Sequence, residues 1–422
     1  MKLLCLSNGH GEDVIAVRIL EQLQHQNPAL ELAALPLVGE GYAYTKLAIP
    51  IIGKVQKMPS GGFVYMDGRQ LLRDVKGGLL KLLLAQYKVV RKWSKSGGKI
   101  LAVGDIVPLL LAWMSGADYA FVGTAKSEYY LRDEAGWYPK TSKWERFSGS
   151  VYYPWERWLM KGKRCQGVFP RDSLTAQMLQ KCKIKAFDLG NPMMDGIFPA
   201  NSAPIFYNSN SEERELGRSL KVLLLPGSRD REAYQNWELI LQAISGVMVT
   251  FRERSPVFLA AIAPSLDLTQ LQQILLASGW ISKPLSLLET PISDSEALGF
   301  SQKNATLLLT QNAYHECLLA ADVAIAMAGT ATEQFIGLGK PAIAIPGKGP
   351  QYTYAFAEAQ TRLLGPSLTL VKNPERVANT IKAILSDPDR IQLIAENGQQ
   401  RMGQPGAAAR IANFLNESLA GN

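Results

Sequence analysis

The chain has 422 residues with 47% hydrophobic and 19% charged content, which fits two or three folded domains and excludes an intrinsically disordered chain. Its four cysteines are scattered without a CxxC pair, so we expect reduced thiols and neither a disulfide framework nor a metal cluster. No stretch reaches the roughly 18 unbroken apolar residues of a membrane-spanning helix. Residues 1–7 are typical of a strand rather than a signal peptide. We therefore expect a cytoplasmic protein, either soluble or attached peripherally to a membrane.

Short apolar runs alternate with helix-like segments through the first half of the chain. The predicted strands are Lys2–Leu6, Leu32–Leu37, Ile100–Val103, Tyr119–Val122, Gly167–Phe169 and Ala186–Leu189. The predicted helices include Asp13–Leu23, Gly78–Trp93, Ile106–Met114 and Ser173–Lys181. This alternation predicts a parallel β-sheet covered by helices on both faces.

A polar run at 200–213 is typical of a linker, and a second alternation comes after it. Strands are predicted within 221–229, 257–264, 305–310, 323–329 and 341–346, and the end of the chain from 374 to 419 is mainly helical. The sequence therefore predicts an α/β protein with two Rossmann-like, doubly wound domains facing a cleft. The expected boundaries are 1–196 for the first domain, 197–219 for the linker, 220–372 for the second domain, and 373–422 for C-terminal helices that pack back toward the first domain. In such domains ligands bind at the carboxyl ends of the strands, where strand-to-helix turns lie.

The segment LLLPGSR at 223–229 is one such turn. It brings a strand to Gly227, Ser228 and Arg229. Glycine allows a ligand to approach the backbone, the serine hydroxyl can donate, and arginine binds phosphate through two parallel hydrogen bonds. An ordinary turn with a surface arginine is the alternative interpretation.

The segment AGTATEQ at 328–334 opens a helix with small residues, where unpaired amides and the helix dipole favour an anion. Glu333, one turn into this helix, could accept hydrogen bonds from a pair of ribose hydroxyls. Thr330 or Thr332 acting as the helix N-cap fits the same residues.

Two further segments contain glycine and proline, and we interpret one as a candidate sugar-binding loop and the other as a hinge. GKGPQYTYAFAEAQ at 347–360 places Gln351 after a glycine-rich loop, where it could reach sugar hydroxyls, although a plain loop before an amphipathic helix is the alternative. GNPMMD at 190–195 lies at the domain junction, and its glycine and proline favour a rigid turn of the hinge over a catalytic role.

LLPGSR, GTAT followed by Glu333, and GNPMMD together resemble lipid-A-disaccharide synthase, a glycosyltransferase of the two-domain GT-B fold. AADVAIAMAGTATEQ and GKGPQYTYAFAEAQ are also similar to the peptidoglycan lipid-linked GlcNAc transferase and the galactolipid synthases. The resemblance is greatest to the lipid-A-disaccharide synthase-related branch of cyanobacteria and plastid-bearing organisms. It implies transfer of a sugar from a UDP-sugar to a lipid or lipid-linked acceptor, with inversion and with no metal. The UDP-sugar would be a co-substrate, and no other cofactor is implied.

The resemblance also implies roles for individual residues. Those that would contact the donor diphosphate are Gly227, Ser228 and Arg229 on one turn and Gly329, Thr330 and Ala331 on the other. Glu333 would bind the ribose, and Gln351 would lie near the donor sugar.

In SNGHGED at 7–13, which joins the first strand to the first helix, Asn8, Gly9 and Gly11 would form the acceptor-side turn. This segment resembles the glycine–histidine turns of the lipid-linked and galactolipid transferases. His10 is the first candidate for the catalytic base, because the pKa of a histidine lies near neutrality. A histidine that only fixes the turn is the alternative.

Asp105 in AVGDIVP, at the end of another predicted strand, is the second candidate for the base. The family has an acidic, proline-containing motif at this strand end, but here the apolar IVPLLLAW stands where the family has a second Asp and polar residues. Glu12 is the third candidate. We interpret His25 and His315, which lie in helical segments, as structural.

The positive charge is concentrated in the first half, where residues 1–200 carry 27 Lys and Arg against 17 Asp and Glu. This favours an anionic partner. The predicted helix at 78–95 has lysines on one narrow face, which fits either a membrane interface or a packed helix with one solvated face. The stretch at 137–164 mixes aromatic and cationic residues and favours an anionic membrane or a lipid acceptor. No nucleic-acid-binding motif accompanies the charge, so we do not expect nucleic acid as the partner.

These observations favour a glycosyltransferase that moves a sugar from a UDP-sugar to a lipid acceptor at the membrane surface. A UDP-GlcNAc 2-epimerase-like enzyme and a nucleotide-sugar-binding protein without turnover are the alternatives. The altered GDIVP motif keeps the last of these open. The sequence leaves the oligomeric state open too, with a homodimer as one alternative.

Overall fold

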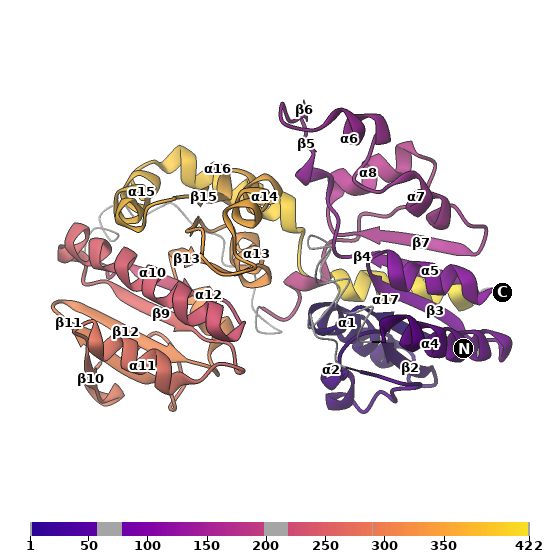
Figure 1. The fold of residues 1–422 in the computed structure, drawn as a ribbon, viewed down its shortest axis with the longest axis horizontal. Coiled ribbons are helices and arrows are strands. Elements are labelled where there is room, and N and C mark those ends of the chain that lie inside the picture. Colours follow the sequence, from indigo (N-terminus) through magenta and orange to yellow (C-terminus); the bar gives the residue numbers. More distant parts are fainter. Residues whose placement is uncertain (1, 57–77, 198–217, 289, 421–422) are drawn as a thin grey trace. The chain divides into compact units, whose positions relative to one another are not determined.

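A computed structural model describes residues 2–56, 78–197, 218–288 and 290–420 of the chain. These residues form two compact units (Figure 1). Unit 1 comprises Met1–Asp195 and Gly403–Asn422, and unit 2 comprises Gly196–Met402. Each unit contains its own sheet. Of the predicted linker at 197–219, residues 198–217 lie outside the described residues.

Unit 1 is built on a five-stranded parallel sheet with the order β2-β1-β3-β4-β7. Its strands are β1 (Lys2–Ser7), β2 (Glu31–Pro36), β3 (Lys99–Gly104), β4 (Tyr119–Gly123) and β7 (Cys165–Pro170). Its main helices are α1 (His10–Gln26), α2 (Tyr42–Lys46), α4 (Leu79–Lys95), α5 (Ile106–Ser115), α6 (Lys143–Ser148), α7 (Pro154–Met160), α8 (Ser173–Lys181) and α17 (Ala407–Ala420). The remaining short elements are η1 (Glu128–Tyr130), β5 (Arg132–Asp133), β6 (Gly136–Trp137) and η2 (Pro192–Met194).

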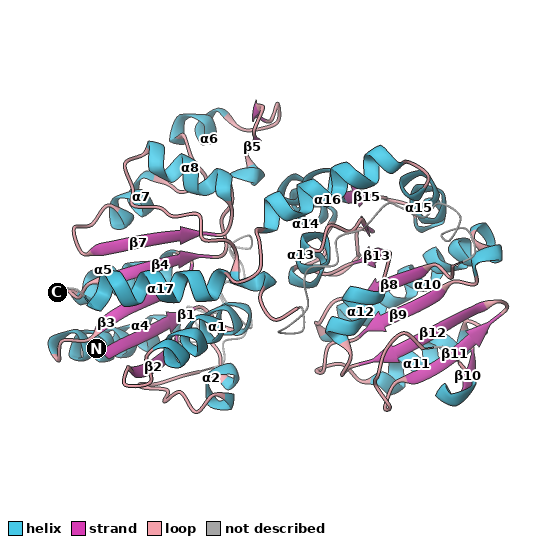
Figure 2. Ribbon diagram, turned by 180° about the vertical axis from the view of Figure 1, so that it is seen from behind, coloured by secondary structure: helices cyan, strands magenta, loops and turns pink. Residues whose placement is uncertain are grey.

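The apolar runs become strands because both faces of this sheet are covered. Leu3 and Cys5 face a core built with α1 and α17, whereas Leu4 and Leu6 face a second core built with α4, α5 and α7. Figure 2 shows α1 and α17 together on one face of the sheet. The predicted strand Ala186–Leu189 is wrong, because this segment makes only a single bridge from Ala186 to Val168.

Helix α4 corresponds to the predicted basic helix at 78–95, and its apolar face packs inside unit 1. Leu82 and Val90 are buried. The buried amide of Gln86 donates through Nε2 to the carbonyl oxygens of Leu37 and Lys54, both at 3.1 Å. The lysines therefore occupy the solvated side of a packed helix, as in the second of the two interpretations.

Unit 2 is built on an eight-stranded sheet with the order β10-β11-β12-β9-β8-β13-β14-β15. Its strands are β8 (Lys221–Leu225), β9 (Val257–Ala261), β10 (Ile281–Lys283), β11 (Leu298–Gln302), β12 (Ala305–Thr310), β13 (Val323–Ala326), β14 (Ala342–Ala344) and β15 (Leu368–Leu370). The pairs β10–β11 and β11–β12 are antiparallel, and the other pairs are parallel. The sequence did not predict the antiparallel extension, because β10 is exposed along its length and has no apolar pattern.

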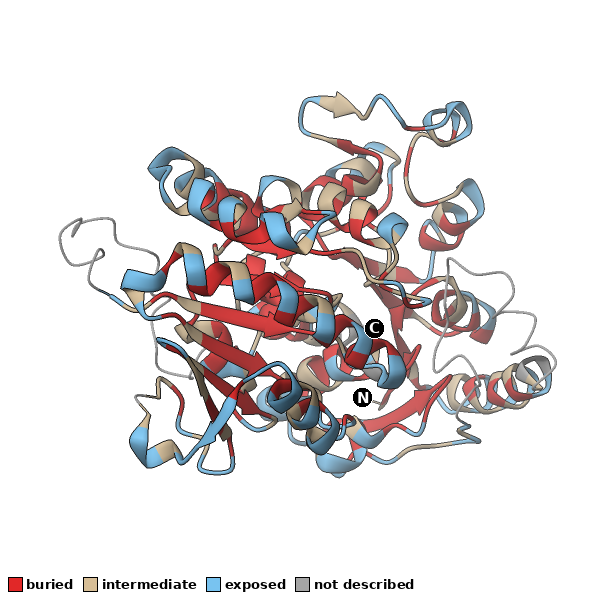
Figure 3. Cartoon of the chain, turned by 60° about the vertical axis from the view of Figure 1, so that its left-hand side comes forward, coloured by how far each residue is buried: buried red, intermediate tan, exposed pale blue. Residues whose placement is uncertain are grey.

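The helices of unit 2 cover this sheet as in a doubly wound domain. They are α10 (Asp230–Thr250), α11 (Leu268–Ala277), α12 (Tyr314–Ala320), α13 (Thr330–Gly337), α14 (Tyr354–Leu364), α15 (Val377–Leu385) and α16 (Pro388–Met402). Four single 3-10 turns join these elements: η3 (Arg252–Arg254), η4 (Leu285–Leu287), η5 (Gly365–Ser367) and η6 (Pro374–Arg376). Buried residues shown in red in Figure 3 line the sheet and the inner faces of the helices. Trp237 of α10 is fully buried and anchors this helix.

The C-terminal helical segment is shared between the units. Helices α15 and α16 belong to unit 2, whereas α17 belongs to unit 1 and packs against α1. The GNPMMD segment holds α17 in place, because the Asp195 carboxylate accepts hydrogen bonds from the N–H groups of Ala407 (3.1 Å) and Ala408 (2.7 Å). Arg18 of α1 donates to the carbonyl of Pro192 at 2.7 Å. In this structure the motif is architectural.

Candidate functional site

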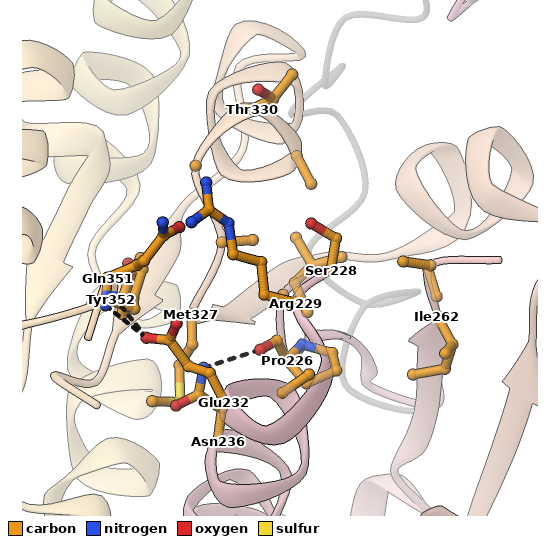
Figure 4. A pocket seen from close by; sticks show the side chains of 18 of the residues that line it. Pro226, Ser228, Arg229, Glu232, Asn236, Ile262, Met327, Thr330, Gln351 and Tyr352 are labelled. Carbon is orange, nitrogen blue, oxygen red and sulfur yellow. Dashed lines mark hydrogen bonds between the residues drawn. The ribbon is translucent and has the colours of Figure 1, made fainter. Parts of the chain in front are cut away.

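A cavity of about 690 Å³ opens in unit 2 at the carboxyl ends of β8, β9, β12 and β13 (Figure 4). Seven of the eight residues expected to bind the donor line it, namely Gly227, Ser228, Arg229, Gly329, Thr330, Ala331 and Gln351. The eighth, Glu333, is buried in α13 and does not line the cavity. The structure thus brings together three separate segments of the sequence in one place.

The PGSR turn forms one wall of the cavity, and glycine is required there. Gly227 has φ of +100°, and a Cβ atom at this position would lie 3.1 Å from the carbonyl oxygen of Met327. Helix α10 begins directly after Arg229, which is its N-cap residue, and no side chain caps this helix. The first N–H groups of α10 are therefore available to an anion.

Arg229 extends into the cavity, with its guanidinium on the side where the Gln351 amide lies (Figure 4). Burial lowers the pKa of Arg229, and the nearby Glu232 carboxylate opposes this shift. An arginine stays charged at neutral pH even after such a shift. The cavity therefore contains a positive charge beside the start of a helix.

Helix α13 forms the opposite wall and also begins at the cavity. Its N-cap is Gly329, and no side-chain cap bonds to it, so the predicted cap by Thr330 or Thr332 is wrong. Thr332 instead donates through Oγ1 to the carbonyl of Ala328 at 2.6 Å. Gln360 of α14 donates to the carbonyls of Ala328 (3.1 Å) and Gly329 (3.2 Å). These two hydrogen bonds hold the turn that precedes α13. Two helix N-termini thus meet at one cavity.

The loop that carries Gln351 is held by a residue that the sequence analysis missed. Glu232 Oε1 accepts hydrogen bonds from the backbone N–H groups of Tyr352 (2.6 Å) and Gln351 (3.1 Å) (Figure 4). Gly349 allows this contact, because a Cβ atom there would lie 2.4 Å from Glu232 Cγ. Asn236, one turn further along α10, donates to the carbonyl of Pro226 at 2.9 Å. The glycines at 347 and 349 were the available sequence signal for this close approach.

A second group of candidate residues lies in unit 1, where β1 and β3 end. Gly9 is the N-cap of α1 with φ of +140°, and a Cβ atom there would lie 3.2 Å from the carbonyl oxygen of Val38. Asn8 is buried against Gly104, where a Cβ atom would lie 2.8 Å from Asn8 Cγ. Gly11 is exposed with open space around its Cα. The side chain of His10, which begins α1, lies outside the described part of the structure.

The two carboxylate candidates of unit 1 have different environments. Asp105 is the N-cap of α5, and its Oδ1 accepts a hydrogen bond from the N–H of Val107 at 2.7 Å. Burial, together with the charges of Asp105 and Asp13, raises the pKa of Glu12 to about 7. Thr124 Oγ1 donates to Glu12 at 3.4 Å. A group that transfers protons at neutral pH needs a pKa near 7, which Glu12 has.

The remaining two histidines lie near the ends of helices. His25 lies in the last turn of α1 and His315 in the first turn of α12, and both are exposed. Within the ranges that the structure describes, no group of three or more His, Cys, Asp or Glu side chains is arranged to hold a metal ion. Across the same ranges, no helix is long and apolar enough to span a bilayer.

No family model matches the chain. Among curated proteins, a lipid-A-disaccharide synthase of Syntrophus aciditrophicus (strain SB) is 29% identical over 209 residues, which cover 45% of this chain and 47% of that protein. The chain thus matches about half the length of this relative.

Solved structures are similar over nearly the whole chain at low identity. The UDP-GlcNAc 2-epimerase of Neisseria meningitidis, bound to UDP-GlcNAc, has a TM-score of 0.55 at 12% identity and covers 100% of both chains. MnaA of S. aureus, solved with UDP, has a TM-score of 0.55 at 13% identity, with coverage of 99% of this chain and 97% of that one. MurG of Acinetobacter baumannii has a TM-score of 0.52 at 13% identity and covers 99% of both chains.

These likenesses confirm the predicted GT-B fold. The expected similarity to lipid-A-disaccharide synthase is confirmed over the matched residues. The chain is therefore a GT-B protein that is similar in sequence to lipid-A-disaccharide synthase and similar in structure to enzymes of UDP-sugars.

Proposed function

We propose that this protein is a glycosyltransferase that moves a sugar from a UDP-sugar to a lipid or lipid-linked acceptor at a membrane surface, with inversion and without a metal. One observation carries the proposal. Two helix N-termini without side-chain caps, those of α10 and α13, meet at a single cavity that also contains the Arg229 guanidinium. This is the chemistry that binds a diphosphate.

The donor would lie in this cavity with its diphosphate between the PGSR and GTA turns. Gln351 would contact the sugar. The ribose contact is better assigned to Gln334 than to Glu333, because Gln334 lines the cavity and accepts a hydrogen bond from the Tyr314 hydroxyl at 2.6 Å. Glu333 does not line the cavity.

In the transfer step, a hydroxyl oxygen of the acceptor attacks the anomeric carbon while the bond from that carbon to the UDP oxygen breaks. Arg229 and the helix amides stabilise the charge that develops on UDP. We assign the acceptor proton to the Glu12 carboxylate, because the raised pKa of Glu12 matches neutral pH. Asp105 is then a positioning residue, since it caps α5. His10 stays the alternative base.

An epimerase of UDP-GlcNAc is a second candidate, because the solved UDP-GlcNAc 2-epimerase of Neisseria meningitidis is as similar in fold to this chain as MurG is. A nucleotide-sugar-binding protein without turnover is the third. Under each of the three candidate functions, the nucleotide sugar would bind in the same cavity. The candidates differ in the reaction that the bound sugar then undergoes.

The test is UDP release from a panel of UDP-sugars, with and without a membrane lipid extract, by wild type, Glu12→Gln, Asp105→Asn and His10→Ala. Glu21→Gln is the matched control, because Glu21 is exposed on the same helix. We expect lipid-stimulated release that falls about 100-fold or more in Glu12→Gln and is unchanged in Glu21→Gln. Conversion of UDP-GlcNAc to its epimer without lipid would favour the second candidate, and binding of UDP without turnover the third.

A further inference from the structure

Helices α5 and α7 of unit 1 pack together, and each exposes apolar side chains. Trp155 and Trp158, three residues apart on α7, are 53% and 58% exposed. Leu110 and Met114, one turn apart on α5, are also exposed. The ring of Trp158 lies 4.8 Å from that of Trp113 on α5, so the two helices join at this point. We call Leu110, Met114, Trp155 and Trp158 the tryptophan patch.

Both tryptophans of α7 expose more than half of their surface. Tryptophan is among the most costly side chains to leave in water, and grouped exposed apolar residues mark an interaction surface. The Trp155 ring stacks on that of Tyr153 at 4.6 Å, which keeps it in a fixed position at the surface. This contact sets the position of Trp155 only.

Cations come directly after the patch in the sequence. Lys161, Lys163 and Arg164 lie immediately beyond the end of α7 and are all exposed. The ion pairs found among the described residues do not include any of the three. Residues 137–164 carry seven Lys and Arg against two Asp and Glu. One of those two acids, Glu156, is buried and paired with Lys126 at 2.5 Å.

The combination favours a lipid surface over a protein partner. Tryptophan is enriched where a bilayer meets water, because its ring is apolar and its N–H is polar. Lysine is depleted in protein–protein interfaces, but near an anionic membrane each lysine or arginine contributes about 1 kcal/mol of attraction. Two of the three cations beside the patch are lysines.

We infer that the tryptophan patch and the cations at 161–164 dock unit 1 onto an anionic membrane. This inference deepens the membrane part of the proposed function and names the surface that carries it. Trp155, Trp158, Leu110 and Met114 enter the headgroup region, and Lys161, Lys163 and Arg164 contact anionic headgroups.

The test is co-sedimentation of the full chain with vesicles of phosphatidylcholine alone or with about 30 mol% phosphatidylglycerol. Three variants are compared with wild type: Trp155→Ala with Met114→Gln for the apolar part, Lys161→Gln with Lys163→Gln and Arg164→Gln for the charge, and Leu276→Ala with Leu287→Ala as control. Leu276 and Leu287 are exposed apolar residues of unit 2. Trp158 is left in place, because its contact with Trp113 joins α5 to α7. Urea unfolding of each variant checks that it folds.

We expect binding to the anionic vesicles that falls roughly tenfold in the apolar variant. The charge variant should lose the preference for phosphatidylglycerol, and the control should bind as wild type does. Equal binding by the folded apolar variant overturns the inference. A concentration-dependent dimer that the apolar variant abolishes, with no vesicle binding by wild type, assigns the patch to a second copy of the chain and overturns it too.

The proposed function is tested separately from this surface. Binding of UDP to the cavity of unit 2 involves none of the patch residues, so it should be the same in every variant. If vesicle binding fails while UDP binding persists, only the membrane surface is wrong.

Discussion

The Glu232 carboxylate accepts a hydrogen bond of 2.6 Å from the backbone N–H of Tyr352, a residue 120 positions further along the chain. This bond ties the first turn of α10 to the loop that carries Gln351. Because Arg229 precedes the same turn, one side chain fixes the spacing between two walls of the cavity in unit 2. The geometry of the cavity therefore depends on a residue that need not touch the ligand.

Removing this carboxylate should weaken donor binding without unfolding the protein. In Glu232→Ala the two N–H groups lose their acceptor, and we expect the Kd for UDP to rise about 5- to 10-fold, equivalent to about 1–1.4 kcal/mol. Glu232→Gln keeps a side-chain oxygen and should lose less. Titration calorimetry measures both. Glu238→Ala, at an exposed position of the same helix, is the control. An unchanged Kd in Glu232→Ala would show that the loop is held by other contacts.

Alanine should lower the free energy of unfolding at Gly227 and raise it at Gly246. Gly227→Ala places a Cβ at φ of +100° and 3.1 Å from the Met327 carbonyl, so we expect a loss of about 1–3 kcal/mol in the free energy of unfolding. Gly246 lies inside α10, and a Cβ there would make ordinary contact with Ala378 at 3.4 Å. Gly246→Ala should therefore gain about 0.5–1 kcal/mol. Urea unfolding measures both, and a stable Gly227→Ala protein would contradict the strained turn.

Glu12 should make the stability of the protein depend on pH. Its pKa is about 7 in the folded protein and near 4.5 in the unfolded chain, so between these values the folded state holds a proton that the unfolded state has lost. Stability from this group is therefore complete below pH 4.5 and is lost as the pH rises through 7. The loss amounts to at most about 3 kcal/mol.

The measurement compares urea unfolding at pH 5 and pH 8 for wild type and Glu12→Gln. Other carboxylates contribute equally to both proteins, so the difference between them isolates Glu12. The variant should lose less stability than wild type over this range, whereas Glu21→Gln should behave as wild type does. Parallel curves for wild type and Glu12→Gln would mean that Glu12 titrates at its ordinary pKa.

Asp195 should determine how firmly α17 is attached to unit 1. Its carboxylate accepts hydrogen bonds from three successive N–H groups, those of Gly406 (2.5 Å), Ala407 (3.1 Å) and Ala408 (2.7 Å). We expect Asp195→Ala to lose about 1–3 kcal/mol and to speed hydrogen exchange in α17. Asp188→Ala, at an exposed position nearby, should do neither. Unchanged exchange in α17 would show that its apolar contact with α1 suffices.

The central strands could be predicted because each is buried on both faces and therefore apolar along its length, as Leu3–Leu6 shows. The turns that line the cavity of unit 2 could be located because glycine and arginine follow a predicted strand, although an ordinary turn with a surface arginine fits the same residues. Strand β10 could not, because Ile281–Lys283 is exposed and carries no pattern. The segment Ala186–Leu189 has the pattern of a strand, but it makes only one bridge.

The roles of the acidic residues could not be read from spacing. Glu232 finds its partners 120 residues away, and the pKa of Glu12 depends on burial and on Asp105, which lies on another strand end. The sequence therefore ranked Glu12 below His10 and Asp105, although the structure gives Asp105 a capping role. Such properties arise from tertiary contacts, which a local pattern does not contain.

The central claim is that the cavity between α10 and α13 binds the diphosphate of a UDP-sugar, and titration of UDP into wild type and Arg229→Met tests it most directly. Arg231→Met is the matched control, since Arg231 is an exposed arginine two residues away on α10. We predict that the Kd for UDP rises at least about tenfold in Arg229→Met and stays unchanged in Arg231→Met. Equal binding of UDP by wild type and Arg229→Met would contradict the account.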